Sequence, residues 1–177
     1  MRERIRKLCL IAVFCAIICA LSPLTIPMPI GVPLTLQTFI ISVTAFLLGA
    51  KAGTAAVICY ILLGVAGLPV FSGFGAGAGV LLSPTGGFIV AFPLFALILS
   101  FAFYVNKIIL KILIGLSAII LLYAAGTVQF TVVSGVGPVT AAGAFSLYFI
   151  KDVAVIFAAY FLCVRIRPVI QKSIHPK

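Results

Sequence analysis

Residues 108–133 read IILKILIGLSAIILLYAAGTVQFTVV, an unbroken apolar stretch that carries a single charged side chain, Lys111. About 20 apolar residues in a helix are enough to cross the hydrocarbon core of a bilayer. The stretch therefore predicts a transmembrane helix. Its continuous apolar character does not suit a barrel strand, in which apolar and polar residues alternate.

Further apolar stretches on both sides of this segment extend the same pattern over the whole chain. We expect them to form the remaining spans, at residues 8–21, 34–50, 53–70, 88–105 and 140–164. The segment between the third and fourth spans, residues 71–87, is rich in glycine, and its backbone cannot lie unpaired against lipid, so it should fold back over the protein. The prediction is an all-α membrane protein with six transmembrane helices in a single domain, residues 1–177.

The composition agrees with this fold class. Hydrophobic residues make up 64% of the chain, charged residues 8%, and the mean hydropathy is +1.41. Soluble domains carry about a quarter charged residues. The five cysteines lie in apolar runs without metal-ligand spacing, and the one histidine, His175, is in the C-terminal tail. We therefore expect no bound metal and no cofactor.

Basic residues are confined to alternate connections between the predicted spans. Lys51 and Lys107 lie in the second and fourth connections, and the other basic residues outside the sixth span lie near Lys107 or flank the two ends of the chain, up to Lys177. The positive-inside rule places these connections and both termini in the cytoplasm. The net charge of +10 is then a topology signal in a multi-pass protein of the plasma membrane, and nucleic-acid binding is not expected.

Lys151 and Asp152 are charged residues inside the predicted sixth span. Ionisable groups at membrane depth are costly and usually face a cavity or a partner, so the pair marks a candidate ligand site. Adjacent residues on a helix point about 100° apart, which favours separate partners over a direct side-chain pair. The structural alternative is that the two charges neutralise each other or that Lys151 snorkels outward.

Polar residues mark the outer end of the second span. Thr35 and Gln37 follow a rigid proline-containing loop. They have the chemistry to hydrogen-bond a solute at the mouth of a site, and equally to cap the helix or bond to its neighbours.

A pair of glycines follows Thr85 at the start of the fourth span. The backbone N–H groups of Gly86 and Gly87 would be accessible there, which suits an anionic or carbonyl group. A plain helix-start loop is the alternative.

Small residues form a stripe on the first span. Ala12, Ala16 and Ala20 recur every four residues, so another helix can approach closely along this face. Packing inside the protein and contact with a partner subunit both explain such a stripe.

Three sequence motifs together resemble the BioY family, the biotin-binding S components of energy-coupling factor (ECF) vitamin transporters. They are VPLTLQTF at residues 32–39, LLGVAGLPVF at residues 62–71 and PTGG at residues 84–87. Their order and spacing match the family, and the resemblance extends over nearly the whole chain. It implies a six-helix S component that holds biotin near the outer face, under the loops joining spans one to two and three to four.

The resemblance also implies partners and a set of binding residues. The partners are a transmembrane T subunit, two cytoplasmic ATPase subunits and membrane lipid, with the alanine stripe as the contact to the T subunit. Aromatic residues would flank the apolar ring of biotin. The expected substrate-binding set is Lys151, Asp152, Tyr148, Thr35, Gln37, Phe39, Phe71, Thr85, Gly86 and Gly87.

The chain departs from the family pattern at several positions. Many members carry an Asp-x-x-Lys motif near the start of the sixth span. When its lysine is aligned with Lys151, Tyr148 stands in the aspartate position and Asp152 follows instead. Ser83 replaces a usual glycine, and Gln129 lies in a stretch that often bears an aromatic residue.

Other functions are compatible with the pattern of residues alone. An S component for another vitamin, such as thiamine or riboflavin, and a small membrane channel or scaffold are the alternatives. An intramembrane enzyme is not expected, because one aspartate without an intramembrane histidine does not make a catalytic set.

Overall fold

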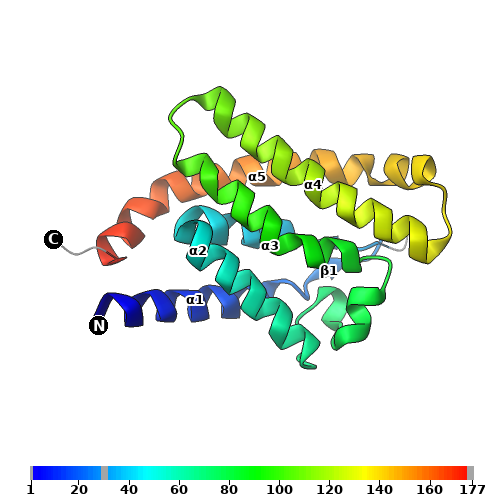
Figure 1. Cartoon of the computed structure of the whole chain (residues 1–177), viewed down its shortest axis with the longest axis horizontal. Coiled ribbons are helices and arrows are strands. Elements are labelled where there is room, and N and C mark those ends of the chain that lie inside the picture. The colour runs from blue at the N-terminus through cyan, green and yellow to red at the C-terminus, as the bar shows by residue number, and fades with distance from the viewer. Residues whose placement is uncertain (1, 29–31, 175–177) are drawn as a thin grey trace.

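The computed structural model describes residues 2–28 and 32–174, and within them the chain forms five α-helices (Figure 1). The helices are α1 (Arg2–Leu21), α2 (Gln37–Val65), α3 (Gly86–Ser100), α4 (Ile108–Ser134) and α5 (Pro138–Ile174). Short 3-10 turns, η1 (Ser72–Phe74), η2 (Ala78–Leu82) and η3 (Phe101–Phe103), join them, and β1 (Thr25–Ile26) pairs antiparallel with β2 (Leu34–Thr35).

Membrane-spanning helices dominate this fold, as predicted. In the part of the chain that the structure describes, four helices are long and apolar enough to cross a bilayer: α2, α4, most of α5, and α3 continued through η3. The first two turns of α1 are charged, and α1 is not one of the four. The chain is therefore a predominantly helical, multi-pass membrane protein.

Helix α2 folds back on itself at Gly49. This residue has φ 75° and ψ −175°, a conformation outside the helical region that is almost restricted to glycine. A Cβ on Gly53 would lie 3.1 Å from the Cα of Ala45, whereas residues eight apart in a straight helix are separated by about 12 Å. The arms 37–48 and 50–65 are thus antiparallel neighbours, and they contain most of the stretches predicted as the second and third spans.

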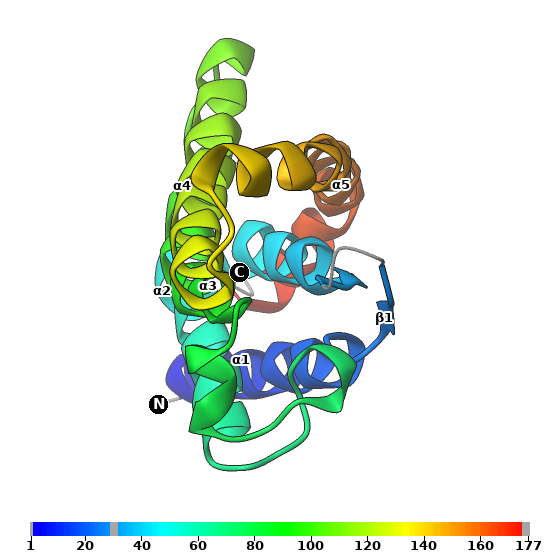
Figure 2. The ribbon, with the colours of Figure 1, turned by 90° about the vertical axis from the view of Figure 1, so that its right-hand side faces the viewer.

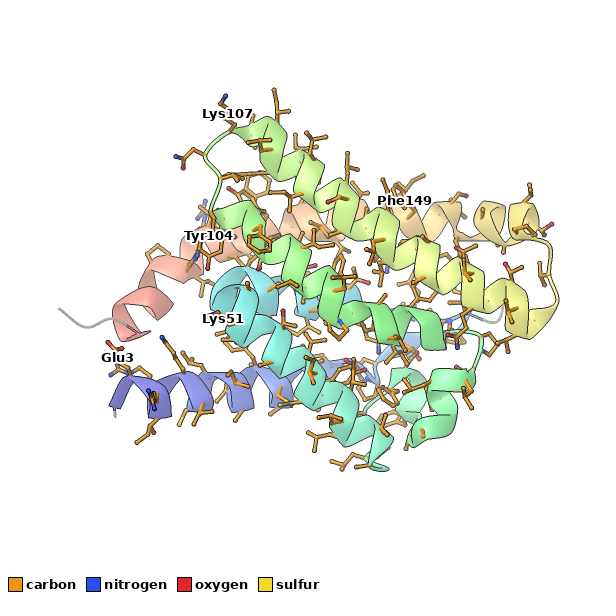
Figure 3. The ribbon with its side chains drawn as sticks, in the orientation of Figure 1. Glu3, Lys51, Tyr104, Lys107 and Phe149 are labelled. Atoms are coloured by element: carbon orange, nitrogen blue, oxygen red, sulfur yellow. The ribbon has the colours of Figure 1, made fainter. Side chains whose placement is uncertain are left out.

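The two ends of the molecule differ in what they carry. Both termini, the turn of α2 near Lys51 and the connection before Lys107 lie toward one end (Figures 1 and 3). The β1–β2 pair, the glycine-rich segment and the turn between α4 and α5 lie at the other end, which faces the viewer in Figure 2. Lys177 and His175 lie outside the described residues.

The helix ends differ from the predicted spans where charged residues continue a helix beyond its apolar part. Helix α1 begins at Arg2 and not at residue 8, and α5 continues past the predicted residue 164 to Ile174. The first residue of α5, Pro138, has a fixed φ that suits the first position of a helix. Hydropathy predicts the membrane-embedded part of a helix, and the helix itself is longer.

The glycine-rich segment folds back over the protein, as predicted. The backbone N–H of Gly77 donates to the carbonyl of Gly64 on α2 at 2.8 Å, and that of Gly73 donates to the carbonyl of Pro23 at 3.2 Å. These bonds give the carbonyls of two buried residues the partners that lipid cannot supply.

Glycines let aromatic rings lie directly on neighbouring helix backbones. The Phe71 ring covers Gly64 on α2, and the Phe88 ring covers Gly126 on α4, where an added Cβ would meet ring carbons. Next to the contact between Phe71 and Gly64, Tyr60 is fully buried, and its ring meets the Phe71 ring edge to face with centroids 5.6 Å apart. Close approach at small residues is the usual packing mode between membrane helices.

Gly49→Ala is expected to lower the apparent melting temperature of the detergent-solubilised protein. Alanine would have to adopt the φ of +75°, and its Cβ would lie 2.9 Å from the hydroxyl oxygen of Tyr104. Strained backbone of this kind costs about 1–3 kcal/mol. The matched control is Gly115→Ala in α4, where an added Cβ meets nothing within 4 Å. Scanning fluorimetry of both variants is the measurement, and a Gly49→Ala protein that melts with the wild type would contradict the tight turn.

Candidate functional site

A cavity of about 60 Å³, partly open to solvent, lies beneath the β1–β2 pair and the first 3-10 turn, between α2, α3, α4 and α5. The lining combines polar groups with aromatic rings. It consists of Val32, Pro33, Thr35, Gln37, Thr38, Ser72, Thr85, Phe88, Ile89, Phe92, Leu122, Tyr123, Phe145, Tyr148, Lys151 and Asp152.

The charged centre of the cavity is a buried ion pair on α5. Asp152 is 4% exposed, and the Nζ of Lys151 lies 2.6 Å from its Oδ1. The expectation of separate partners for these adjacent residues is therefore wrong, because the long lysine side chain bends around the helix to reach the carboxylate. Tyr123 on α4 donates its hydroxyl hydrogen to Oδ2 of Asp152 at 2.7 Å.

Two polar atoms of the cavity lack a hydrogen bond within the described part of the chain. They are Oδ1 of Asp152 and Oγ of Ser72, both fully buried. The Lys151 ammonium neutralises Oδ1 by proximity without the geometry of a hydrogen bond. Buried polar atoms are nearly always paired in folded proteins. A buried hydroxyl without a partner beside a buried ion pair indicates a site for a polar ligand.

Aromatic rings form one side of the cavity in an edge-to-face cluster. Phe88 on α3 lies 5.5 Å from both Tyr123 on α4 and Phe145 on α5, measured between ring centroids, and Phe145 lies 6.2 Å from Tyr148. Such a wall suits the apolar part of a small ligand. Tyr148 was predicted from the sequence, whereas Phe88, Tyr123 and Phe145 were not.

The spacing of residues along α5 could have identified Phe145 from the sequence. Phe145, Tyr148 and Asp152 are separated by three and four positions, which places them on one face of a helix. No comparable spacing singles out Tyr123 on α4, because its role depends on a contact with Asp152 on another helix.

The loop before β2 is tied to the helices beneath it. Tyr148 donates its hydroxyl hydrogen to the backbone carbonyl of Val32 at 2.6 Å. Thr35 and Gln37 both line the cavity, and the side-chain Nε2 of Gln37 donates to the hydroxyl of Tyr60 at 2.8 Å. The capping alternative for these residues is not realised, because Leu36 is the N-cap of α2 and no side chain caps it.

The glycine-rich segment is tied to α4 by Gln129. Its Nε2 donates to the carbonyls of Leu81 at 2.6 Å and Ser83 at 2.8 Å. This amide satisfies two loop carbonyls at once, a role that an aromatic side chain at this position could not perform.

Gly86 and Gly87 do not line the cavity, and the structure gives them a packing role instead. A Cβ on Gly86 would lie 2.5 Å from Nε2 of Gln129, and a Cβ on Gly87 would lie 2.5 Å from the carbonyl oxygen of Ala125. The N–H of Gly86 donates to the carbonyl of Ser83 at 3.0 Å, so it is used within the loop. Thr85 is the residue of this motif that reaches the cavity.

Phe39 and Phe71 also lie outside the cavity lining. Phe71 is fully buried against Tyr60 and Gly64, and Phe39 is partly buried against the apolar core. The next residue along the chain, Ser72, occupies the place in the lining that was expected for Phe71.

The alanine stripe lies on the outward face of α1. Ala12, Ala16 and Ala20 are all exposed, whereas Phe14 and Ile18 on the same helix are buried in the core. Packing inside the protein therefore does not explain the stripe.

Relatives in the curated proteins are biotin transporters by name. The biotin transporter BioY of Thermotoga maritima is 42% identical over 110 residues, which cover 57% of this chain and 61% of the relative. That of Rhizobium etli is 34% identical over 145 residues, covering 75% of this chain and 77% of the relative. The chain thus spans about three fifths of the length of the Thermotoga relative.

The fold and the full-length sequence pattern agree with these relatives. A crystal structure of the S-component for biotin from an ECF-type ABC transporter matches with a TM-score of 0.85 and 25% identity, over 94% of this chain and 93% of that one. The sequence profile of the BioY family matches residues 1–172. The chain belongs to the BioY family.

Proposed function

We propose that this protein is the biotin-binding S component of an ECF-type transporter, a subunit for vitamin uptake and not an enzyme. The observation that carries the proposal is the buried Lys151–Asp152 pair in an aromatic cavity, with Oδ1 of Asp152 and Oγ of Ser72 lacking hydrogen bonds. The names of the relatives and of the similar crystal structure support biotin as the ligand.

The chemistry of the cavity suits the parts of biotin. The ureido ring offers two N–H donors and a carbonyl, and the valerate chain ends in a carboxylate. Oδ1 of Asp152 can accept from a ureido N–H, and the Lys151 ammonium can donate to the ureido carbonyl or to the carboxylate. Phe88, Phe145 and Tyr148 would then flank the apolar thiophane ring.

The two loops over the cavity would form its outer cover. The bond from Tyr148 to Val32 holds the first loop to α5, and the two bonds from Gln129 hold the glycine-rich segment to α4. Biotin bound beneath them would be shielded from water, which strengthens each of its polar contacts.

The proposed topology has six spans in one domain, with both termini in the cytoplasm of the cell and the chain in the plasma membrane. The two antiparallel arms of α2 would each count as a span beside α1, α3, α4 and α5. Lys51 and Lys107 lie toward the same end as both termini (Figure 3), and the positive-inside rule assigns that end to the cytoplasm.

The proposed partners are a transmembrane T subunit and two cytoplasmic ATPase subunits. The sequence contains no Walker A motif of its own, so the energy for uptake would come from those ATPases. The exposed Ala12, Ala16 and Ala20 offer a close-packing face to a helix of the T subunit.

Lys151→Ala is expected to lower the affinity for biotin at least about tenfold, the equivalent of about 1.4 kcal/mol. The substitution removes a donor to the ligand and leaves the Asp152 carboxylate buried without its cation. Asp152→Asn should have a smaller effect, because the amide oxygen still accepts a hydrogen bond. Isothermal titration of the purified protein with biotin, thiamine and riboflavin is the measurement.

The matched control for this charge removal is Lys51→Ala, an exposed lysine away from the cavity, which should bind biotin as the wild type does. If Lys151→Ala binds biotin with wild-type affinity, the ion pair is structural. Tighter binding of thiamine or riboflavin than of biotin by the wild type would refute the proposed ligand.

Single cysteines introduced at Gly79 and Ser134, in a background without the native cysteines, are expected to react with a membrane-impermeant maleimide from outside intact cells. Both positions are exposed, Gly79 in the glycine-rich segment and Ser134 at the end of α4, and no charged residue lies near either in the sequence. A cysteine at Asn106 should react only after permeabilisation. The reverse pattern would show that the proposed orientation is inverted.

Ala16→Leu is expected to weaken co-purification with a T subunit while leaving biotin binding intact, because leucine prevents the close approach of a partner helix. Ala158→Leu is the matched control, since Ala158 is exposed on α5 and outside the stripe. Pull-down of tagged variants coexpressed with the transporter subunits measures the effect. Equal recovery of both variants would remove the stripe from the interface.

A further inference from the structure

A second cavity of about 70 Å³, open along one side, lies between α3, α4 and α5. One face of α4 lines it through positions spaced three or four apart, from Ile108 to Ile119, and Phe157 and Tyr160 face them from α5. Apart from Lys111 and the Tyr160 hydroxyl, its lining side chains are all apolar. We call this cavity the α4–α5 groove.

The groove opens toward lipid near the end of the molecule that carries the termini. Figures 1 and 2 show the first half of α4 standing out from the bundle. The rim is correspondingly exposed, with Ile108 at 61% and Phe157 at 45%. An apolar hollow at membrane depth must be filled by apolar matter, because water has no polar partners there.

Lys111 spans the polar end of the groove. From α4, its Nζ donates to the hydroxyl of Tyr160 on α5 at 2.7 Å and lies 5.2 Å from the centre of the Tyr160 ring. An ammonium has three donors, and a hydroxyl carries no charge to neutralise it.

Neither acidic residue of the chain is placed to neutralise Lys111. The sequence has two, Glu3 and Asp152. Asp152 is engaged by Lys151 and Tyr123 in the candidate biotin site. Glu3 lies on α1, far from the start of α4 (Figure 3). A partly buried charge is costly without a counter-ion, and an anion bound from outside the described chain would supply one.

We propose that the α4–α5 groove binds an anionic phospholipid, with one acyl chain in the groove and the headgroup phosphate at Lys111 and Lys107. Lys107 is exposed at the N-cap of α4, one turn before Lys111. The free N–H groups of the first helical turn add positive potential at the same place. The site thus pairs two cations with an apolar channel, as an amphiphilic anion requires.

Gly115 provides a test of the acyl-chain part that leaves the charges in place. It lines the groove one turn beyond Lys111, and a Cβ added there meets nothing within 4 Å. In Gly115→Leu the new side chain would start from open space and extend into the groove. Gly143→Leu is the matched control, because Gly143 on α5 is exposed, has the same free space and does not line the groove.

The experiment is native mass spectrometry of the delipidated full-length protein, titrated with dioleoylphosphatidylglycerol, dioleoylphosphatidylcholine or inorganic phosphate. The wild type is expected to bind phosphatidylglycerol at least about fivefold more tightly than phosphatidylcholine and to bind phosphate alone too weakly to detect. Lys111→Gln should lower phosphatidylglycerol affinity about tenfold, the equivalent of about 1.4 kcal/mol. Gly115→Leu should weaken both lipids, and Gly143→Leu neither.

Several outcomes would overturn the proposal. They are equal binding of the two lipids by the wild type, an unchanged preference in Lys111→Gln, wild-type binding by Gly115→Leu, or a lipid-free dimer that fills the groove with a second copy. If Lys111→Gln does not fold, Lys107→Gln repeats the charge test at an exposed position and should also reduce the preference for phosphatidylglycerol. None of these readings depends on biotin binding.

Discussion

A carboxylate buried in a membrane protein has to be neutralised and hydrogen-bonded, and the arrangement around Asp152 meets this constraint. Lys151 supplies the opposite charge from the same helix, and Tyr123 supplies a hydrogen bond from α4. Breaking such a set leaves an uncompensated charge, which is far more costly than the set itself is stabilising. The requirement therefore holds α4 and α5 in register and brings the polar groups of the cavity together.

Close packing at glycines makes the rest of the cavity possible. Phe88 lies against Gly126, and Gly87 lies against the backbone of Ala125, so α3 approaches α4 closely enough for Phe88 to meet Tyr123 and Phe145. A single Cβ at either glycine would separate the two helices. The aromatic wall thus depends on residues that never touch the cavity.

The two ends of the molecule use their polar residues differently. At the loop-bearing end, charges are paired and buried, and Tyr148 and Gln129 hold the covering loops by bonds to backbone carbonyls. At the other end, cations rest on aromatic faces: Lys111 lies over Tyr160, and the Arg167 guanidinium lies 4.3 Å from the centre of the Phe103 ring.

The sequence by itself determined the fold class and singled out the charged pair of the candidate site, because both follow from the cost of placing polar groups in lipid. Continuous apolar stretches predicted helices, and the stretch at residues 108–133 coincides closely with α4. Lys151 and Asp152 were conspicuous as charges within such a stretch. Only the tertiary structure decided that the two side chains pair, that α2 turns back at Gly49 and that Ser72 replaces Phe71 in the lining. It also decided that Tyr123 reaches Asp152 and that Gly86 and Gly87 serve close packing. These features depend on which helix faces pack together. A helix that is apolar on all sides has no periodic pattern that would show which face meets which neighbour.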